Sequence, residues 1–260
     1  MRPFSKLILA CGAALTAVLA LAPSGEAHKA ITSKFTYAAD VYPVFLNRCG
    51  HCHVTGGVAP MSLLTYEEAF PWAESLRAEL LEAGNAANDG DFITTAHRGL
   101  SARELDIVMD WAVGGTPEGA NATKPAPVSL RNEWADGAPD LILQPSAAFD
   151  VPADAMEVTQ EFVLPTGLSR ERSGGAIDVL PGTPAVVRDV TISLRTSNAL
   201  PRTIATWTPR QSPALLALDP PLLVPPGAEI SARVHYKKTW KYEGLAMSDR
   251  SAIGLYFADR

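Results

Sequence analysis

The sequence predicts a multidomain protein of the α plus all-β class, in which a small helical unit is followed by an antiparallel β-sandwich. Two observations lead to this prediction. The first part of the chain contains helix N-terminal signals and apolar residues at helical spacing, whereas the second part contains short alternating stretches separated by Pro-Gly turns. A length of 260 residues exceeds the commonest size of a single core, so we expect two domains.

Composition excludes several classes of protein. Hydrophobic residues make up 47% of the chain and charged residues 19%, so the chain can bury a core and is not wholly disordered. A formal net charge of -6 argues against nucleic acid as a partner, because binding to phosphate requires basic surface. Three cysteines are too few for a scaffold of disulfides.

The N-terminus has the pattern of an export signal. A basic start precedes an apolar run over residues 7–22 that is shorter than the roughly 20 residues a membrane-spanning helix needs, and cleavage after Ala27 fits. We therefore expect a signal peptide over residues 1–27, an N-terminal arm over 28–37 and a periplasmic location. The mature protein is expected to be soluble, or anchored by an uncleaved N-terminus or one lipidated at Cys11.

The segment Cys49-Gly50-His51-Cys52-His53 has C-x-x-C-H spacing, in which two thiols one helical turn apart can add to the vinyl groups of a haem. The preceding residues have helical spacing, so the motif should close a helix. A thioredoxin-like dithiol instead opens a helix after an apolar strand, and zinc needs two further ligands. We therefore expect one covalent haem c on Cys49 and Cys52 with His53 on the iron, and a redox dithiol or a metal site as alternatives.

Two capping boxes predict further helices. Thr65 and Glu68 should begin a helix over about residues 65–82, and Ser101 and Glu104 should begin one that ends at Gly114-Gly115. The later helix should bury Leu105, Val108 and Trp111. If the first and last helices cross, Phe45 should pack against Leu105 or Trp111.

Three helices around a C-x-x-C-H motif resemble class I c-type cytochromes, and we assign residues 38–118 to such a domain. The resemblance implies single-electron transfer with a periplasmic redox protein or a membrane electron-transfer complex, without a small-molecule substrate. It also implies that the Pro60 carbonyl accepts the N–H of His53. Met61 then lies on the same side as His53 and serves for packing.

The distal iron ligand departs from the pattern of the family. Similar exported cytochromes carry a Met-Pro-Pro-Trp segment before the last helix, whereas residues 83–92 contain no methionine here. We assign the distal position to His97, with Met109 as the alternative and an open iron if neither binds. A six-coordinate haem transfers electrons, whereas an open one binds small ligands.

The second half reads as a linker followed by a β domain. Residues 119–139 are rich in Pro, Gly, Asn and Ala, which predicts a linker. Residues 140–260 are expected to form the sandwich. Its strands are expected over residues 141–143, 158–163, 177–180, 186–194, 203–207, 230–237 and 253–257.

The β domain resembles the N-terminal copper domain of ascorbate-dependent monooxygenases that act on peptidylglycine or dopamine, over segments that include 186–190 and 234–236. His235 matches one copper-binding histidine of that family. Arg188 and Asp189 stand where the family has two adjacent histidines, and we expect them to form an ion pair. The resemblance then implies a docking or structural module without copper. Alternatives are a haem-plus-copper monooxygenase and a haem-bearing subunit of a respiratory or photosynthetic complex.

Two smaller features of the sequence concern a histidine and a group of lysines. Cleavage after Ala27 would expose His28, whose amine and imidazole together can chelate copper or approach haem iron. Lys237, Lys238 and Lys241 are expected to form a local basic patch.

Overall fold

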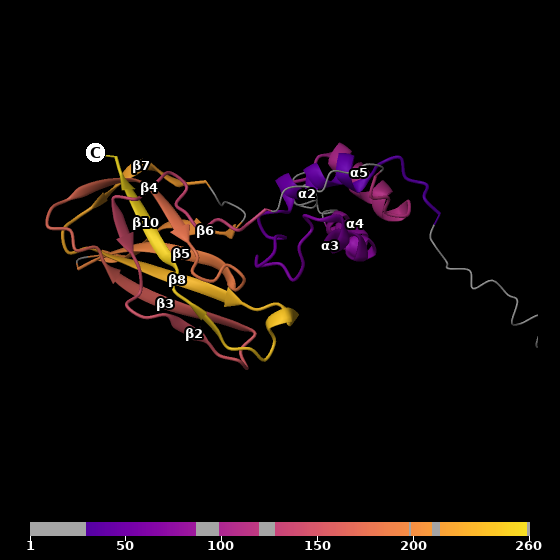
Figure 1. Cartoon of the computed structure of the whole chain (residues 1–260). Helices are drawn as coiled ribbons and strands as arrows, with labels where there is room; N and C mark the ends of the chain where they lie inside the picture. The colour runs from indigo at the N-terminus through magenta and orange to yellow at the C-terminus, as the bar shows by residue number, and fades with distance from the viewer. Residues whose placement is uncertain (1–29, 87–98, 120–127, 198, 210–213, 259–260) are drawn as a thin grey trace, which may run out of the picture.

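The computed structural model of the chain describes residues 30–86, 99–119, 128–197, 199–209 and 214–258 (Figure 1). The predicted signal peptide, His28 and His97 lie outside the described residues. Figure 1 shows the helices of the first part beside the sheets of the second part, with the loop after the first α-helix between them. We use "helical segment" for residues 30–119 and "sandwich" for residues 141–257.

The helical segment consists of short helices whose start signals are local. A π-helix over Tyr37–Val41 leads into α2 (Tyr42–Arg48); α3 (Tyr66–Ala69), a 3-10 turn (Phe70–Trp72), α4 (Ala73–Ala86) and α5 (Ala102–Val113) follow. The Thr65 hydroxyl accepts the N–H of Glu68 at 3.2 Å, as predicted. Both halves of the capping box formed by Ser101 and Glu104 are present, and α5 ends at Gly114 as predicted.

The helix predicted over about 65–82 is broken. Pro71 lies in the 3-10 turn between α3 and α4, and proline has no N–H for the helical hydrogen bond. Even α4 has only 14 residues. In the described ranges, no helix is both long and apolar enough to cross a membrane.

An aromatic cluster holds the helices together. The rings of Phe45 and Trp111 meet edge to face, with centroids 6.1 Å apart and planes at 86°, which confirms the predicted contact. Trp111 is fully buried, and the Tyr37 hydroxyl donates to the Leu63 carbonyl at 2.9 Å. The loop that follows the C-x-x-C-H motif is thereby tied to this core.

Two four-stranded antiparallel sheets share one apolar core in the sandwich. Their orders are β1-β10-β4-β7 and β3-β8-β5-β6, and β2 pairs with β9 in a third sheet. The strands are β1 (Leu141–Leu143), β2 (Phe149–Val151), β3 (Glu157–Pro165), β4 (Arg172–Leu180), β5 (Val187–Thr196), β6 (Ala199–Trp207), β7 (Leu216–Val224), β8 (Glu229–Lys237), β9 (Met247–Asp249) and β10 (Ala252–Phe257).

The alternation of apolar and polar residues along β5 and β8 matches the faces of these strands that are buried. Val190, Ile192 and Leu194 of β5 are buried, and Ile230 and Val234 of β8 are buried opposite them. This part of the sequence prediction is confirmed, because alternation in a half-buried strand depends only on the strand itself.

The predicted fold class, a small helical cytochrome c domain followed by an antiparallel β-sandwich, is wrong. The described residues are mainly β, with ten strands in three sheets, and about 22% of these residues are helical. Two physical reasons account for the difference. Pro71 shortens the helices of the first part, and the sequence hides β7, which carries Pro220 and Pro221 at an edge of its sheet, where proline is tolerated.

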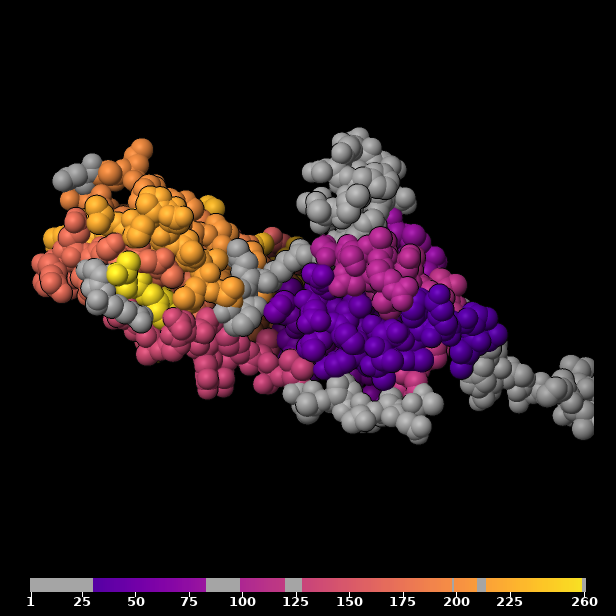
Figure 2. All heavy atoms as spheres, turned by 90° about the horizontal axis from the view of Figure 1, so that it is seen from above, coloured from indigo at the N-terminus to yellow at the C-terminus, as the bar shows by residue number. Residues whose placement is uncertain are grey.

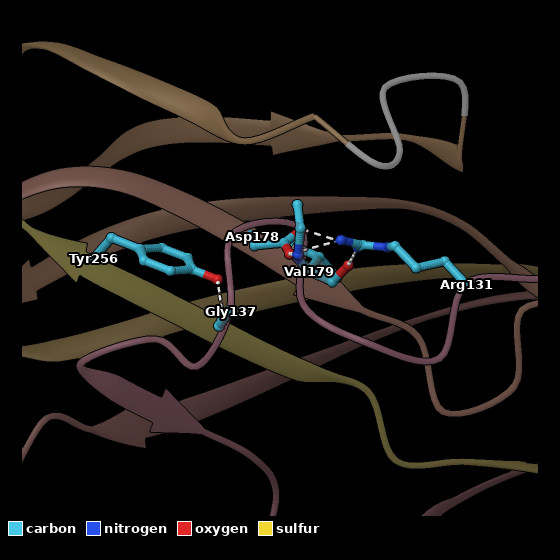
Figure 3. Close-up of polar contacts among 6 residues, drawn as sticks. Arg131, Gly137, Asp178, Val179 and Tyr256 are labelled. Carbon is cyan, nitrogen blue, oxygen red and sulfur yellow. Dashed lines mark hydrogen bonds and ion pairs between the residues drawn. The ribbon is translucent and has the colours of Figure 1, made fainter.

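A buried ion pair attaches residues 128–140, which we call the connecting segment, to the sandwich (Figure 3). Arg131 donates to both carboxylate oxygens of Asp178, at 2.7 and 2.9 Å, and to the Val179 carbonyl at 2.8 Å. The Asp178 side chain is fully buried. Nearby, the Tyr256 hydroxyl donates to the Gly137 carbonyl at 2.9 Å. Residues 131–137, inside the predicted linker, are therefore attached to β4 and β10.

Candidate functional site

The C-x-x-C-H motif begins where α2 ends. Cys49 is the C-terminal cap residue of α2, and its N–H donates to the Phe45 carbonyl at 2.9 Å. The N–H groups of Cys52 and His53 then both donate to the Cys49 carbonyl, at 3.0 and 2.8 Å. The motif therefore closes a helix, as predicted, and one compact turn holds both half-buried cysteines beside His53.

Two glycines allow this turn to be so tight. A Cβ on Gly50 would lie 2.7 Å from the Leu46 carbonyl oxygen, and a Cβ on Gly57 would lie 2.4 Å from the Cys52 carbonyl oxygen. Both positions therefore require the absence of a side chain. The backbone of the motif and that of the following loop are packed directly on each other.

The loop after the motif orients the ring of His53. Hydrogen bonds from the Ala59 N–H to the Cys52 carbonyl at 3.1 Å and from the Leu63 N–H to the His53 carbonyl at 3.1 Å fix the loop. Nδ1 of His53 then lies 3.2 Å from the Met61 carbonyl oxygen. A carbonyl only accepts, so the contact is a hydrogen bond in the tautomer protonated on Nδ1, in which the lone pair is on Nε2.

This geometry changes one expected role. The resemblance implied that the Pro60 carbonyl accepts from His53, whereas the carbonyl in hydrogen-bond contact is that of the next residue, Met61. The reason is the path of the loop, whose anchoring bonds at Ala59 and Leu63 lie on either side of Met61. Pro60 lines the neighbouring cavity.

The two cysteines and His53 line a cavity of about 530 Å³. The remaining lining is mostly apolar and comes from α2, the loop, the 3-10 turn, α4 and α5, with Arg188 added from β5. These residues are Val44, Phe45, Val58, Ala59, Pro60, Met61, Leu63, Trp72, Ser75, Leu76, Glu79, Leu80, Leu100, Val108 and Arg188. Cofactor sites in proteins commonly have volumes of about 300–1,000 Å³ with apolar walls, and this cavity falls in that range.

Neither candidate for the distal position is among the described residues that line the cavity. His97 lies outside the described residues. Met109 lies on α5, where it is partly buried against the apolar cluster of the helical segment.

The helical segment and the sandwich lie against each other (Figure 2). His51 and Gly57 share a small cavity of about 40 Å³ with Arg131 and Trp207. Farther along the loop, Pro60 and Met61 share a pocket with Lys241 of the sandwich. The surroundings of the C-x-x-C-H motif are therefore built by both parts of the chain.

His235 is held between two carboxylates on the face of the sandwich. Its Nδ1 lies 2.8 Å from Oδ2 of Asp189, and its Nε2 lies 2.8 Å from Oε1 of Glu157. Partial burial opposes protonation, but these two hydrogen bonds outweigh it and raise the pKa of His235 above 6.5. In the described part of the chain, no group of three or more His, Cys, Asp and Glu residues is arranged to hold a metal ion.

Two expectations for the sandwich are wrong. Asp189 contacts His235 instead of forming the expected pair with Arg188, whose Nε donates to the Lys237 carbonyl at 3.2 Å. Lys238 is not part of a surface patch, since only 2% of its surface is exposed. Its Nζ contacts the carbonyls of Pro152, Ala153 and Leu245. Burial and carbonyl contacts of this kind depend on strand pairing and are invisible to local sequence patterns.

Sequence reasoning did not identify the cavity residue Arg188 or the carboxylate of Glu157 as parts of these sites. Both positions depend on how β3, β5 and β8 pair, so no local motif signals them. Comparison with models of known families finds no match for this chain, and no curated protein matches it either.

Proposed function

We propose that this chain is an exported monohaem c-type cytochrome that carries single electrons between periplasmic redox partners, with the sandwich as a docking or structural module. The observation that supports it most is the cavity of about 530 Å³ lined by Cys49, Cys52 and His53 together. Haem bound there supplies one-electron chemistry, because its iron alternates between the ferric and ferrous states.

The residues around the cavity fit a tetrapyrrole. Cys49 and Cys52 would supply the two thiols, and each would add across one vinyl group, so that sulfur bonds to one carbon and the hydrogen goes to the other without any oxidant. His53 is oriented by its contact with the Met61 carbonyl, 3.2 Å from Nδ1, which favours the tautomer with its lone pair on Nε2, the nitrogen that would ligate iron. The apolar walls, such as those made by Phe45 and Leu80, exclude water from the macrocycle.

Covalent haem is tested with the full chain, expressed with its export signal in a host that has the haem-attachment machinery. We expect a pyridine haemochrome spectrum of the c type and an intact mass raised by one haem. A Cys49→Ala/Cys52→Ala variant should lose both signals. Cys11→Ala, which changes the cysteine of the predicted signal peptide, should keep them.

Either of two results would overturn the proposal. One is a secreted wild-type protein with the mass of the polypeptide alone. The other is a Cys49→Ala/Cys52→Ala variant that keeps covalently bound haem.

We also assign the distal position on the iron to His97, from the sequence. Replacing His97 by Ala should convert a low-spin absorption spectrum to a high-spin one, because the iron loses a strong-field ligand. His51→Ala is the matched control, since His51 faces the small cavity against the sandwich. A His97→Ala protein that keeps the low-spin spectrum of the wild type would reject this ligand.

A further inference from the structure

Arg188 occupies an irregular point of β5. On one side of it Val187 pairs with Tyr236, and on the other side Asp189 pairs with His235. Because the two partners are neighbours in β8, Arg188 has no partner of its own and is the extra residue of a β-bulge. A bulge takes a side chain out of the regular alternation, and this one directs Arg188 to the cavity beside the helical segment.

Arg188 connects the sandwich with the proposed cofactor site. It lines the cavity of about 530 Å³ together with Cys49, Cys52 and His53. Among the described lining residues, it alone comes from the sandwich, and Glu79 of α4 carries the other full charge. The helical segment thus supplies the apolar walls, while the sandwich supplies a cation.

The positive charge of the Arg188 guanidinium is only partly compensated by neighbouring acceptors. Its Nε donates to the Lys237 carbonyl at 3.2 Å, and within the described ranges no carboxylate forms an ion pair with it. Burial lowers the pKa of Arg188, because the charged form loses hydration, although Cys52 and then Glu157 act in the opposite direction. A half-buried guanidinium with unused donors is best matched by a planar carboxylate, which can accept two parallel hydrogen bonds.

We infer that Arg188 is a positioning residue for the cofactor, and that its guanidinium binds a propionate carboxylate of the tetrapyrrole. This inference rests on the proposed function, because it requires haem in the cavity. It gives the sandwich a direct role, since a cation of β5 would hold the haem of the helical segment. A positive charge near the iron also disfavours the ferric form, so Arg188 raises the reduction potential.

The test uses the full haem-loaded protein and compares Arg188→Gln with Arg233→Gln, which removes an exposed guanidinium from the neighbouring strand β8. Arg188→Gln should shift the redox equilibrium about tenfold toward the ferric form, which is a fall of about 59 mV in the potential of a one-electron couple. The propionate bending band in its resonance Raman spectrum should also shift. Arg233→Gln should leave both quantities unchanged.

Arg188→Lys separates charge from geometry. A lysine keeps the positive charge but loses the fork that matches a carboxylate, so the potential should stay near the wild-type value while the Raman band shifts. If Arg188→Gln is not recovered in folded form, this variant decides alone, and an unchanged band overturns the inference.

The possible failures are distinguishable. If Arg188→Gln keeps the wild-type potential and Raman band, or changes no more than Arg233→Gln, the inference is wrong while the proposed haem protein stands. If the wild-type protein carries no covalent haem, the proposed function fails, and this inference fails with it.

Discussion

The ion pair of Arg131 with Asp178, which attaches the connecting segment to the sandwich, can be tested by replacing Arg131. The Asp178 side chain has no exposed surface, and that of Arg131 is 16% exposed. Removing one partner of a buried ion pair costs about 3–5 kcal/mol, because the other charge stays buried without compensation. In Arg131→Ala, Asp178 still accepts the N–H groups of Ala135 at 2.9 Å and Val179 at 2.8 Å. These remaining bonds place the expected loss at the lower end, about 3 kcal/mol.

The free energy of unfolding is measured by urea denaturation, and the midpoint of thermal unfolding by circular dichroism in the β-sheet band. A loss of about 3 kcal/mol should lower the thermal midpoint by roughly 10 °C for a unit of this size. Arg131→Lys should lose less than Arg131→Ala, because it keeps the charge without the bidentate geometry.

Arg195→Ala is the matched control in the same sandwich. Its side chain is 39% exposed, and its guanidinium lies 3.5 Å from Glu161 and 3.7 Å from Glu229, so its loss should cost about 1 kcal/mol or less. If Arg131→Ala is destabilised no more than Arg195→Ala, the reasoning from burial and bidentate geometry is refuted.

Three further predictions concern the site and its support. The pKa of His235 is raised, so the protonated histidine should make the wild type more stable than His235→Gln. This added stability should be complete below about pH 6.5 and lost as the pH rises through the raised pKa. A difference in thermal midpoint between the two proteins that is the same at every pH would contradict this. Gly57→Ala should lower the yield of covalent haem, because its Cβ would lie 2.4 Å from a carbonyl oxygen, whereas Gly174→Ala, with its nearest atoms at 3.5 Å, should keep the wild-type yield. Lys238→Met should cost about 1–3 kcal/mol in urea denaturation, since it removes the buried ammonium that donates to the carbonyls of Pro152 and Leu245, and a loss within error of zero would show that these contacts add no stability.

Features that depend on a few neighbouring residues could be predicted from the sequence. The caps at Thr65 and Ser101 are local hydrogen bonds, and they mark the starts of α3 and α5 where expected. The burial alternation in β8 follows from the geometry of a single strand. How far a helix continues is less local, as the 3-10 turn at Pro71 demonstrates.

Features that depend on pairing across the chain could not be predicted. The strand β7 contains Pro220 and Pro221, and only its position at a sheet edge makes that possible. Arg188 reaches the cavity because β5 has one residue more than β8 at that point, which no property of β5 alone reveals. The role expected for Pro60 moved to Met61 because the backbone bonds on either side of the loop set its path.

Arg131 connects the buried ion pair of the sandwich with the surroundings of the C-x-x-C-H motif. Arg131 binds the buried Asp178 of β4 and also lines the small cavity that His51 shares with Trp207. The same residue thus attaches the connecting segment to the sandwich and contacts the surroundings of the C-x-x-C-H motif. Because a buried bidentate pair has little freedom of orientation, it fixes the Arg131 side chain and with it one wall of this small cavity. The Arg188 side chain of β5 thus lines one cavity together with Cys49, Cys52 and His53, which lie more than a hundred residues earlier in the chain.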